Sequence, residues 1–337
     1  MILLSFVYLT RQKKLNEHYL GFERHAQPID LRLTDSLTIS SYNRYFIGAN
    51  RDSVMLGNRQ RPMEVSIFGS PFRDSSHITI QSERFMFSNL SILMDGKHLF
   101  LLDGNQPFIR RGTVDDWIVR PWITGTYFVS AAPLTNGTAV VMSSLNGMAT
   151  LGKLRSGEHP EKVWFPGVLE KQVDGYFCSF GHLLADPKNN RVVYLYRYRN
   201  QYLVADTNMN LLYRANTIDT ISLAKIKVGK LNGNTFSMSA PPLTVNLNSC
   251  IQDGKLFVHS NMRAANETRM QFLRNSPIDV YDLNDGSYRY SFYIPNRYGA
   301  KILDFRMLDE KKIVALYKDE MTKYEIHRIP SDSTVHR

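Results

Sequence analysis

The chain has little cysteine, and none of it is arranged as a metal site. Its 337 residues include two cysteines, Cys178 and Cys250. The sequence has no Cys-x-x-Cys pair and no cysteine–histidine spacing of the kind that binds zinc. We therefore expect no metal and no cofactor. The two cysteines flank opposite ends of two successive predicted strands. We expect free thiols, because a disulfide needs Cα atoms within about 7 Å.

The sequence also lacks the short motifs that mark common catalytic sites. It contains no P-loop, no His-Glu-x-x-His pair, no dinucleotide fingerprint and no nucleophile elbow. The nearest approach to an elbow, residues 66–70, lacks the glycine that should precede the serine. These absences remove several enzyme classes and leave open whether the protein is an enzyme.

The apolar run at the N-terminus is too short to cross a bilayer. Residues 1–9 are mostly apolar, whereas a spanning helix needs about 20 such residues. Arg11, Lys13 and Lys14 follow the run, although a signal peptide carries its positive charge before it. The segment is either a truncated export signal or membrane anchor, or an element packed on the domain. We favour export, which predicts a periplasmic or cell-envelope location with membrane association through the N-terminus.

Basic residues are numerous but scattered. The chain has 41 Lys and Arg against 31 Asp and Glu, a formal net charge of +10. Such a charge attracts anions, but the dense basic clusters of a nucleic-acid tail are missing. We interpret the excess as a solvated cationic surface and expect no nucleic-acid partner.

The sequence is rich in patterns typical of β structure. It contains 18 Tyr and 18 Phe, which favour strands, and no long segment with helical periodicity. Residues 278–294 show the pattern best, because two alternating runs flank the turn Asn284-Asp285-Gly286. Asp-Gly between such runs predicts a β-hairpin.

One unit recurs along the chain. It consists of a strand with a small polar residue near its start, a turn of Asp, Asn, Gly or Lys, and a strongly apolar strand. The second strands begin near residues 45, 98, 138, 192, 256 and 313, a spacing that suits four-stranded blades. The weakest copy starts at Ser36 and turns at Asn43-Arg44 into Tyr45. The repeat predicts an all-β fold, a six-bladed β-propeller of four-stranded antiparallel blades.

The last unit shows only three strands before Pro330. We expect residues 28–33 to pair with residues 323–329 as its fourth strand, because ring closure hides unpaired strand edges. This gives an N-terminal extension (residues 1–27), a single propeller domain (residues 28–330) and a C-terminal tail (residues 331–337).

The strand, Asp-Gly-Lys turn and apolar strand of this unit are clearest at residues 94–101 and 252–258. In these segments the chain resembles the six-bladed TolB-like and NHL-like propellers found among bacterial envelope and secreted proteins. The resemblance covers about residues 28–330 and implies an architecture rather than one activity.

Polar residues recur at the start of the predicted innermost strands, which line the central channel of a propeller. The candidate ligand-binding residues at this channel mouth are Asn89, Ser130, His182, Asn246, Asp304 and Arg306. Together they offer donors and acceptors, and Arg306 favours an anionic or polar ligand. A hydrated channel without a specific ligand explains the same residues equally well.

A second candidate lies in the run from Tyr194 to Arg199. Tyr196, Arg197 and Arg199 would form an aromatic and cationic surface for a sugar or an anion. The alternative, which we favour, is an aromatic row buried between blades with arginines at a strand end.

These observations predict a non-catalytic binding or scaffolding propeller of the bacterial cell envelope, with an unknown small molecule, glycan or protein as its partner. The alternative is a propeller hydrolase or lyase that acts on carbohydrate or a small ester at the channel mouth. His182 would then be a candidate base, because histidine titrates near neutral pH. A sensor module that has lost its N-terminal anchor is a third hypothesis.

Overall fold

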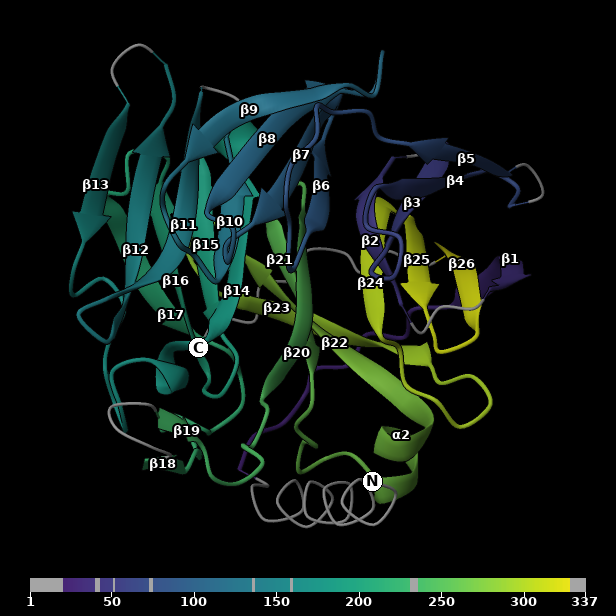
Figure 1. Ribbon diagram of the computed structural model, residues 1–337. Helices are drawn as coiled ribbons and strands as arrows, with labels where there is room; N and C mark the ends of the chain where they lie inside the picture. The colour runs from purple at the N-terminus through teal and green to yellow at the C-terminus, as the bar shows by residue number, and fades with distance from the viewer. Residues whose placement is uncertain are drawn as a thin grey trace.

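The structure is a computed structural model, which describes residues 21–39, 43–50, 52–72, 75–134, 137–157, 160–230 and 236–327. Six four-stranded antiparallel sheets stand as blades around a central axis (Figure 1). The expected six-bladed propeller is therefore confirmed. The hypotheses about residues 1–9 and the tail from residue 331 fall outside the described ranges.

The innermost strands of neighbouring blades lie next to one another around the central channel. Blades 1 to 6 are numbered here by these strands in chain order. The six innermost strands are β2 (Arg44–Ala49), β6 (Ser91–Asp95), β10 (Ser130–Pro133), β14 (Gly181–Asp186), β20 (Asn246–Gln252) and β24 (Asp304–Asp309).

The second and third strands of each blade are mostly buried or partly buried, because neighbouring blades cover both of their faces. The second strands are β3 (Ser53–Asn58), β7 (His98–Asp103), β11 (Thr138–Leu145), β15 (Arg191–Tyr196), β21 (Lys255–Ser260) and β25 (Lys312–Leu316). The third strands are β4 (Glu64–Gly69), β8 (Phe108–Thr113), β12 (Met148–Arg155), β16 (Gln201–Asp206), β22 (Asn275–Asp282) and β26 (Glu320–Ile326).

Most of the outermost strands expose several residues to solvent, as expected at the rim of a ring, whereas the outermost strand of blade 5 is mostly buried or partly buried. They are β5 (Ser75–Thr79), β9 (Val119–Thr124), β13 (Glu161–Phe165), β17 (Leu211–Asn216), β23 (Tyr288–Pro295) and β1 (Leu31–Thr38).

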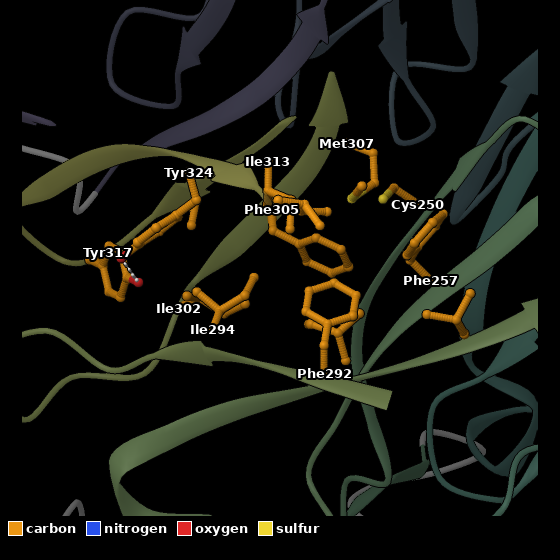
Figure 2. Packing of buried hydrophobic residues seen from close by; sticks show 14 residues of the cluster. Cys250, Phe257, Phe292, Ile294, Ile302, Phe305, Met307, Ile313, Tyr317 and Tyr324 are labelled. Atoms are coloured by element: carbon orange, nitrogen blue, oxygen red, sulfur yellow. Dashed lines mark hydrogen bonds between the residues drawn. The ribbon is translucent and has the colours of Figure 1, made fainter. Parts of the chain in front are cut away.

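Each pair of neighbouring blades buries one apolar cluster between its sheets. Figure 2 shows the cluster between blades 5 and 6, where Phe292 of β23 lies against Phe305 of β24. Cys250 and Met307 lie close together in the same cluster. The core is thus a ring of six interfaces rather than one central mass.

The N-terminal strand closes the ring, as predicted. β1 pairs antiparallel with β26, with Leu31 opposite Ile326 and Thr38 opposite Glu320. The strand spans Leu31–Thr38 rather than residues 28–33, because the pairing follows the full length of β26 through an irregularity near Asp35.

The predicted sixth unit is wrong by one strand. Ser36 belongs to the closing strand, where it lies opposite Thr322. Arg44–Ala49 is the innermost strand of blade 1 and not its second strand, which is Ser53–Asn58. The closing strand has the polar start that the repeat assigns to an innermost strand. The repeat therefore took the closing strand for the innermost strand of blade 1, and took the true innermost strand for the second one.

The two faces of the ring differ in their loops. All innermost strands begin at one face, called here the start face, and end at the other, the end face. Start-face loops carry a two-stranded sheet, a short helix and a 3-10 turn, and an end-face loop carries another 3-10 turn. These elements are β18 (Val228–Lys230), β19 (Phe236–Met238), α2 (Arg269–Arg274), η1 (Phe177–Ser179) and η2 (Pro187–Asn189). Figure 1 shows β18, β19 and α2 on the lower side of the ring, with β18 and β19 at the lower left and α2 at the lower right.

Residues 22–27 form a strap along the edge of blade 5. Ala26 bridges Ser291 of β23, and the Gln27 and Ser291 amides each donate a 3.0 Å hydrogen bond across this contact. Phe22 is buried in a cluster with Leu243 and Met262. The strap thus ties the N-terminal chain to blade 5 before β1 enters blade 6.

A buried arginine anchors this strap. Arg24 is 2 % exposed, and its guanidinium pairs with Glu267 at 2.7 Å and with Asp279 at 2.8 Å. It also donates to the carbonyl of Met262 at 2.9 Å. The two carboxylates compensate the charge of the arginine, which is buried away from water.

Among the residues that the structure describes, none of the helices has the length and apolar character of a membrane span.

Candidate functional site

A cavity of about 280 Å³ occupies the central channel and is lined by all six innermost strands. Asp95, Pro133 and Gln252, which end their strands, line it, so the cavity lies toward the end face. Most of the lining residues are apolar, among them Phe46 and Met307, but polar atoms make up at least half of the exposed wall. The channel therefore offers a small chamber of mixed polar and apolar character.

Of the six residues predicted at the channel mouth, only Arg306 lines this cavity. Its side chain is 32 % exposed, and its Nη1 pairs with Asp304 at 2.7 Å. The same nitrogen donates to the Phe305 carbonyl at 2.7 Å, and the guanidinium lies 5.5 Å from the centre of the Phe46 ring. These contacts fix a cation in the cavity wall.

Asp304 lies behind Arg306, at the first residue of β24. Burial raises the pKa of Asp304, while the charge of Arg306 and a hydrogen bond from the Phe305 amide oppose the rise. The pair is therefore an ion pair whose carboxylate is easier to protonate than a carboxylate in water.

His182 is held neutral beside two arginines. Burial and the charges of Arg197 and Arg306 lower its pKa to about 4, against the opposing effect of a hydrogen bond with the Asn246 backbone. Its Nε2 is buried and has no hydrogen-bond partner. At neutral pH the ring is an uncharged acceptor or donor and not a cation.

Asn246 is held by hydrogen bonds to the backbone of blade 4, and its Oδ1 is buried without a hydrogen-bond partner. The residue is fully buried, and its Nδ2 donates to the carbonyls of Tyr196 at 2.8 Å and Arg199 at 3.2 Å. These bonds tie the start of β20 to the loop after β15. Asn246 and His182 therefore lie together, but only His182 has an unpaired nitrogen beside the arginines.

Asn89 and Ser130 lie elsewhere. They line a separate cleft of about 200 Å³ between blades 2 and 3. Asn89 precedes β6, and its amide and that of Ser88 donate to Asp103 Oδ2 at 2.8 and 2.7 Å. The structure therefore divides the predicted ring into three groups, which are Arg306 with Asp304, His182 with Asn246, and Asn89 with Ser130.

The proposed surface of Tyr196, Arg197 and Arg199 does not exist as an exposed platform. Tyr196 and Arg199 are fully buried, and the Arg199 guanidinium stacks 3.6 Å from the Tyr196 ring centre. Tyr194 packs edge-on against Tyr196 at 5.3 Å. This is the buried aromatic row that the alternative interpretation predicted, and only Arg197 remains partly exposed.

The thiols offer no nucleophile. Cys178 and Cys250 are both free and buried, as expected. Cys250 lines the central cavity, and burial raises its pKa to about 11, so its thiol stays protonated at neutral pH. Within the described ranges, no group of three or more His, Cys, Asp or Glu could hold a metal ion.

The sequence patterns missed most of the cavity wall. Phe46, Met94 and Leu184 line it, and their apolar side chains look the same in the sequence as those of a packed core. The only signal was indirect, because Met94 and Leu184 lie on strands that the repeat marks as innermost, whereas the repeat placed Phe46 on a second strand.

Comparisons with known proteins extend the fold assignment. No family model matches the chain, and no curated protein matches it in sequence. A structure of unknown function from Bacteroides thetaiotaomicron matches with a TM-score of 0.53 and 9% identity, over 90% of this chain and 73% of that one.

A DUF4221-family protein from Bacteroides vulgatus matches with a TM-score of 0.51 and 10% identity, over 90% of this chain and 99% of that one. A streptogramin B lyase structure matches with a TM-score of 0.49 and 10% identity, over 89% and 98%. The two Bacteroides structures thus share the propeller fold with this chain, and identities this low say nothing about its activity.

Proposed function

We propose that this protein is a non-catalytic binding propeller that holds a small molecule in its central cavity. Arg306 anchors an anionic group of the ligand, and the apolar side chains of the wall, among them Phe46 and Met307, contact the rest. The observation that carries the proposal is the placement of Arg306, the single Lys or Arg among the residues that line the cavity.

The size of the cavity fits a small ligand. A cavity of roughly 150 Å³ can hold benzene, and typical ligand sites run from about 300 Å³ upward. The cavity of about 280 Å³ therefore suits a compact carboxylate with an apolar body. An arginine in such a wall binds a carboxylate through charge-assisted hydrogen bonds, which are worth about 1.5–3 kcal/mol.

Asp304 sets the pH dependence of this binding. At neutral pH its carboxylate shares the Arg306 guanidinium and competes with the ligand. Because the pKa of Asp304 is raised, a fall in pH protonates it earlier than an exposed aspartate. We expect a ligand that stays anionic to bind more tightly as the pH falls.

The test is a calorimetric screen of small aromatic and branched aliphatic carboxylates against their amides. We expect a carboxylate to bind, its amide to bind more weakly, and Arg306→Gln to weaken the carboxylate about 10- to 100-fold. Arg155→Gln, at the exposed end of β12, is the matched control. Equal binding to Arg306→Gln and the parent protein would place the site elsewhere.

The alternative is a hydrolase or lyase with His182 as its base. The observation in its favour is the neutral imidazole with an unpaired Nε2 beside Arg197 and Arg306. Turnover of 4-nitrophenyl esters or acidic polysaccharides that is lost in His182→Gln would support it. Absence of turnover across these substrates would favour the binding function.

A cell-envelope location is part of the proposal. Its support is the apolar start of the chain and the resemblance of the repeats to envelope propellers. Fractionation of cells that express the full chain tests it, and recovery in the cytoplasmic fraction alone would contradict it.

A further inference from the structure

Exposed apolar side chains gather at one face of the ring. Eleven of the large exposed hydrophobic residues lie in start-face loops, and none of those described lies in an end-face loop. The most exposed are Tyr298 at 92 % and Met86 at 80 %. Single exposed apolar residues are ordinary, but their restriction to one face marks an interaction surface.

Charge divides between the faces in the same way. Among their described residues, the start-face loops have ten exposed Lys and Arg but only three exposed Asp and Glu. The loops counted here are residues 59–63, 80–90, 104–107, 125–129, 146–147, 166–180, 197–200, 217–245, 261–274, 296–303 and 317–319. In the end-face turns between consecutive strands, the described residues include three exposed Lys and Arg against six exposed Asp and Glu. The start face is thus both apolar and cationic.

The apolar groups are held outward by ordered structure. Arg297 makes a bidentate pair with Glu320 at 2.8 and 2.9 Å, which fixes the turn that carries Tyr298 at its tip. The Asn296 amide donates to the Arg274 carbonyl at 2.8 Å, so this turn adjoins the end of α2. α2 in turn exposes Met270 and Leu273.

We propose that the start face lies on the surface of a bilayer that contains anionic lipid. Apolar side chains that enter the interface and Lys or Arg that contact headgroups are the features of interfacial membrane binding. The exposed groups come from loops of several blades around the ring, from Met86 and Phe87 to Phe236 and Tyr298. A bilayer is larger than the whole face and can contact loops of several blades, whereas a typical protein partner covers only part of such a face.

This orientation is compatible with ligand binding. The central cavity lies toward the end face, so it would point away from the bilayer. The proposal nevertheless does not depend on the cavity, because it uses residues of different loops.

The test is co-sedimentation of the full chain with vesicles of phosphatidylcholine alone or with 30 mol % phosphatidylglycerol. We expect binding to the anionic vesicles, weaker binding to the neutral ones, and weakening in 0.5 M NaCl. Each basic residue near an anionic bilayer is worth about five-fold in partitioning. Lys227→Gln, Lys230→Gln and Arg274→Gln together should therefore weaken binding roughly 100-fold.

The apolar contribution is tested by Met270→Ser, Leu273→Ser and Tyr298→Ser combined, with an expected loss of about ten-fold or more. The matched controls lie off this face. They are Lys97→Gln with Lys188→Gln and Lys311→Gln for charge, and Val163→Ser with Leu211→Ser and Leu212→Ser for apolar surface. Thermal melts confirm that each variant is folded.

Three results would overturn the proposal. The first is no binding to either vesicle, which would leave the face to a protein partner. The second is equal loss in start-face and control variants. The third is binding abolished by Phe6→Ser with Val7→Ser and untouched by the start-face variants, because attachment would then reside in the N-terminal run.

Discussion

Replacing Arg24 tests how the N-terminal chain is attached to the ring. Arg24→Met keeps an unbranched side chain of similar length beside Phe22 and removes the guanidinium. Glu267 and Asp279 then remain buried without their cation, since both are at most 3 % exposed. Breaking a buried ion pair from one side typically costs about 3–5 kcal/mol, because the remaining charge is uncompensated.

The expected shift in melting temperature follows from the size of the chain. The unfolding entropy of 337 residues is about 0.7 kcal/mol per kelvin near the melting temperature. A loss of 3–5 kcal/mol therefore corresponds to a fall of roughly 4–7 °C. Differential scanning calorimetry at neutral pH measures it, and Arg32→Met, on the exposed side of β1, is the matched control.

A second variant separates lost charge balance from lost packing. Adding Glu267→Gln and Asp279→Asn to Arg24→Met removes the two carboxylate charges that have lost their cation. We expect this triple variant to recover much of the lost stability. A single variant that melts within 1 °C of the parent protein would refute the reasoning. So would a triple variant that melts below the single one.

Three further results are expected. Burial raises the pKa of Asp219 to about 6, so its ionisation lowers stability as the pH rises through that value. Asp219→Asn should therefore gain roughly 1–1.5 kcal/mol on the parent protein between pH 5 and pH 8 in denaturant titrations, and a pH-independent difference would contradict this. Native protein should resist thiol reagents at Cys178 and Cys250 until it is denatured, and rapid native labelling would show that the thiols are accessible. Removing residues 1–38 deletes β1 and the strap, so its melting temperature should fall further than that of Arg24→Met, and an unchanged value would mean that closure is dispensable.

Local pattern was enough to predict most of the ring. Five innermost strands carry a polar start, a tight turn and an apolar second strand, and the structure places all five where the repeat put them. The sixth failed because Leu31–Thr38 imitates that polar start while pairing with a strand almost 300 residues away. A repeat defines the unit, but it does not say which end of the chain completes the last one.

The candidate site could be predicted only in part, because its geometry depends on the residue at which each innermost strand begins. Ser130 begins its strand, His182 is the second residue of its own, and Asn89 lies before β6. Equivalent positions in the repeat therefore do not meet in one ring. The Arg24 anchor left no sequence signal at all, since its carboxylate partners lie 243 and 255 residues further along the chain.

The closing strand and the strap have a consequence for synthesis. Roughly 280 residues separate Thr38 from Glu320, so a ribosome that adds about 5–20 residues per second leaves β1 unpaired for roughly 15–60 s. Glu267 and Asp279 emerge before β26 does. Arg24 can therefore dock on blade 5 first and hold β1 beside the place where blade 6 will form. The buried arginine would then act as a guide for the growing chain, one that shortens the search for the last strand and limits the time in which a free edge can pair with another molecule.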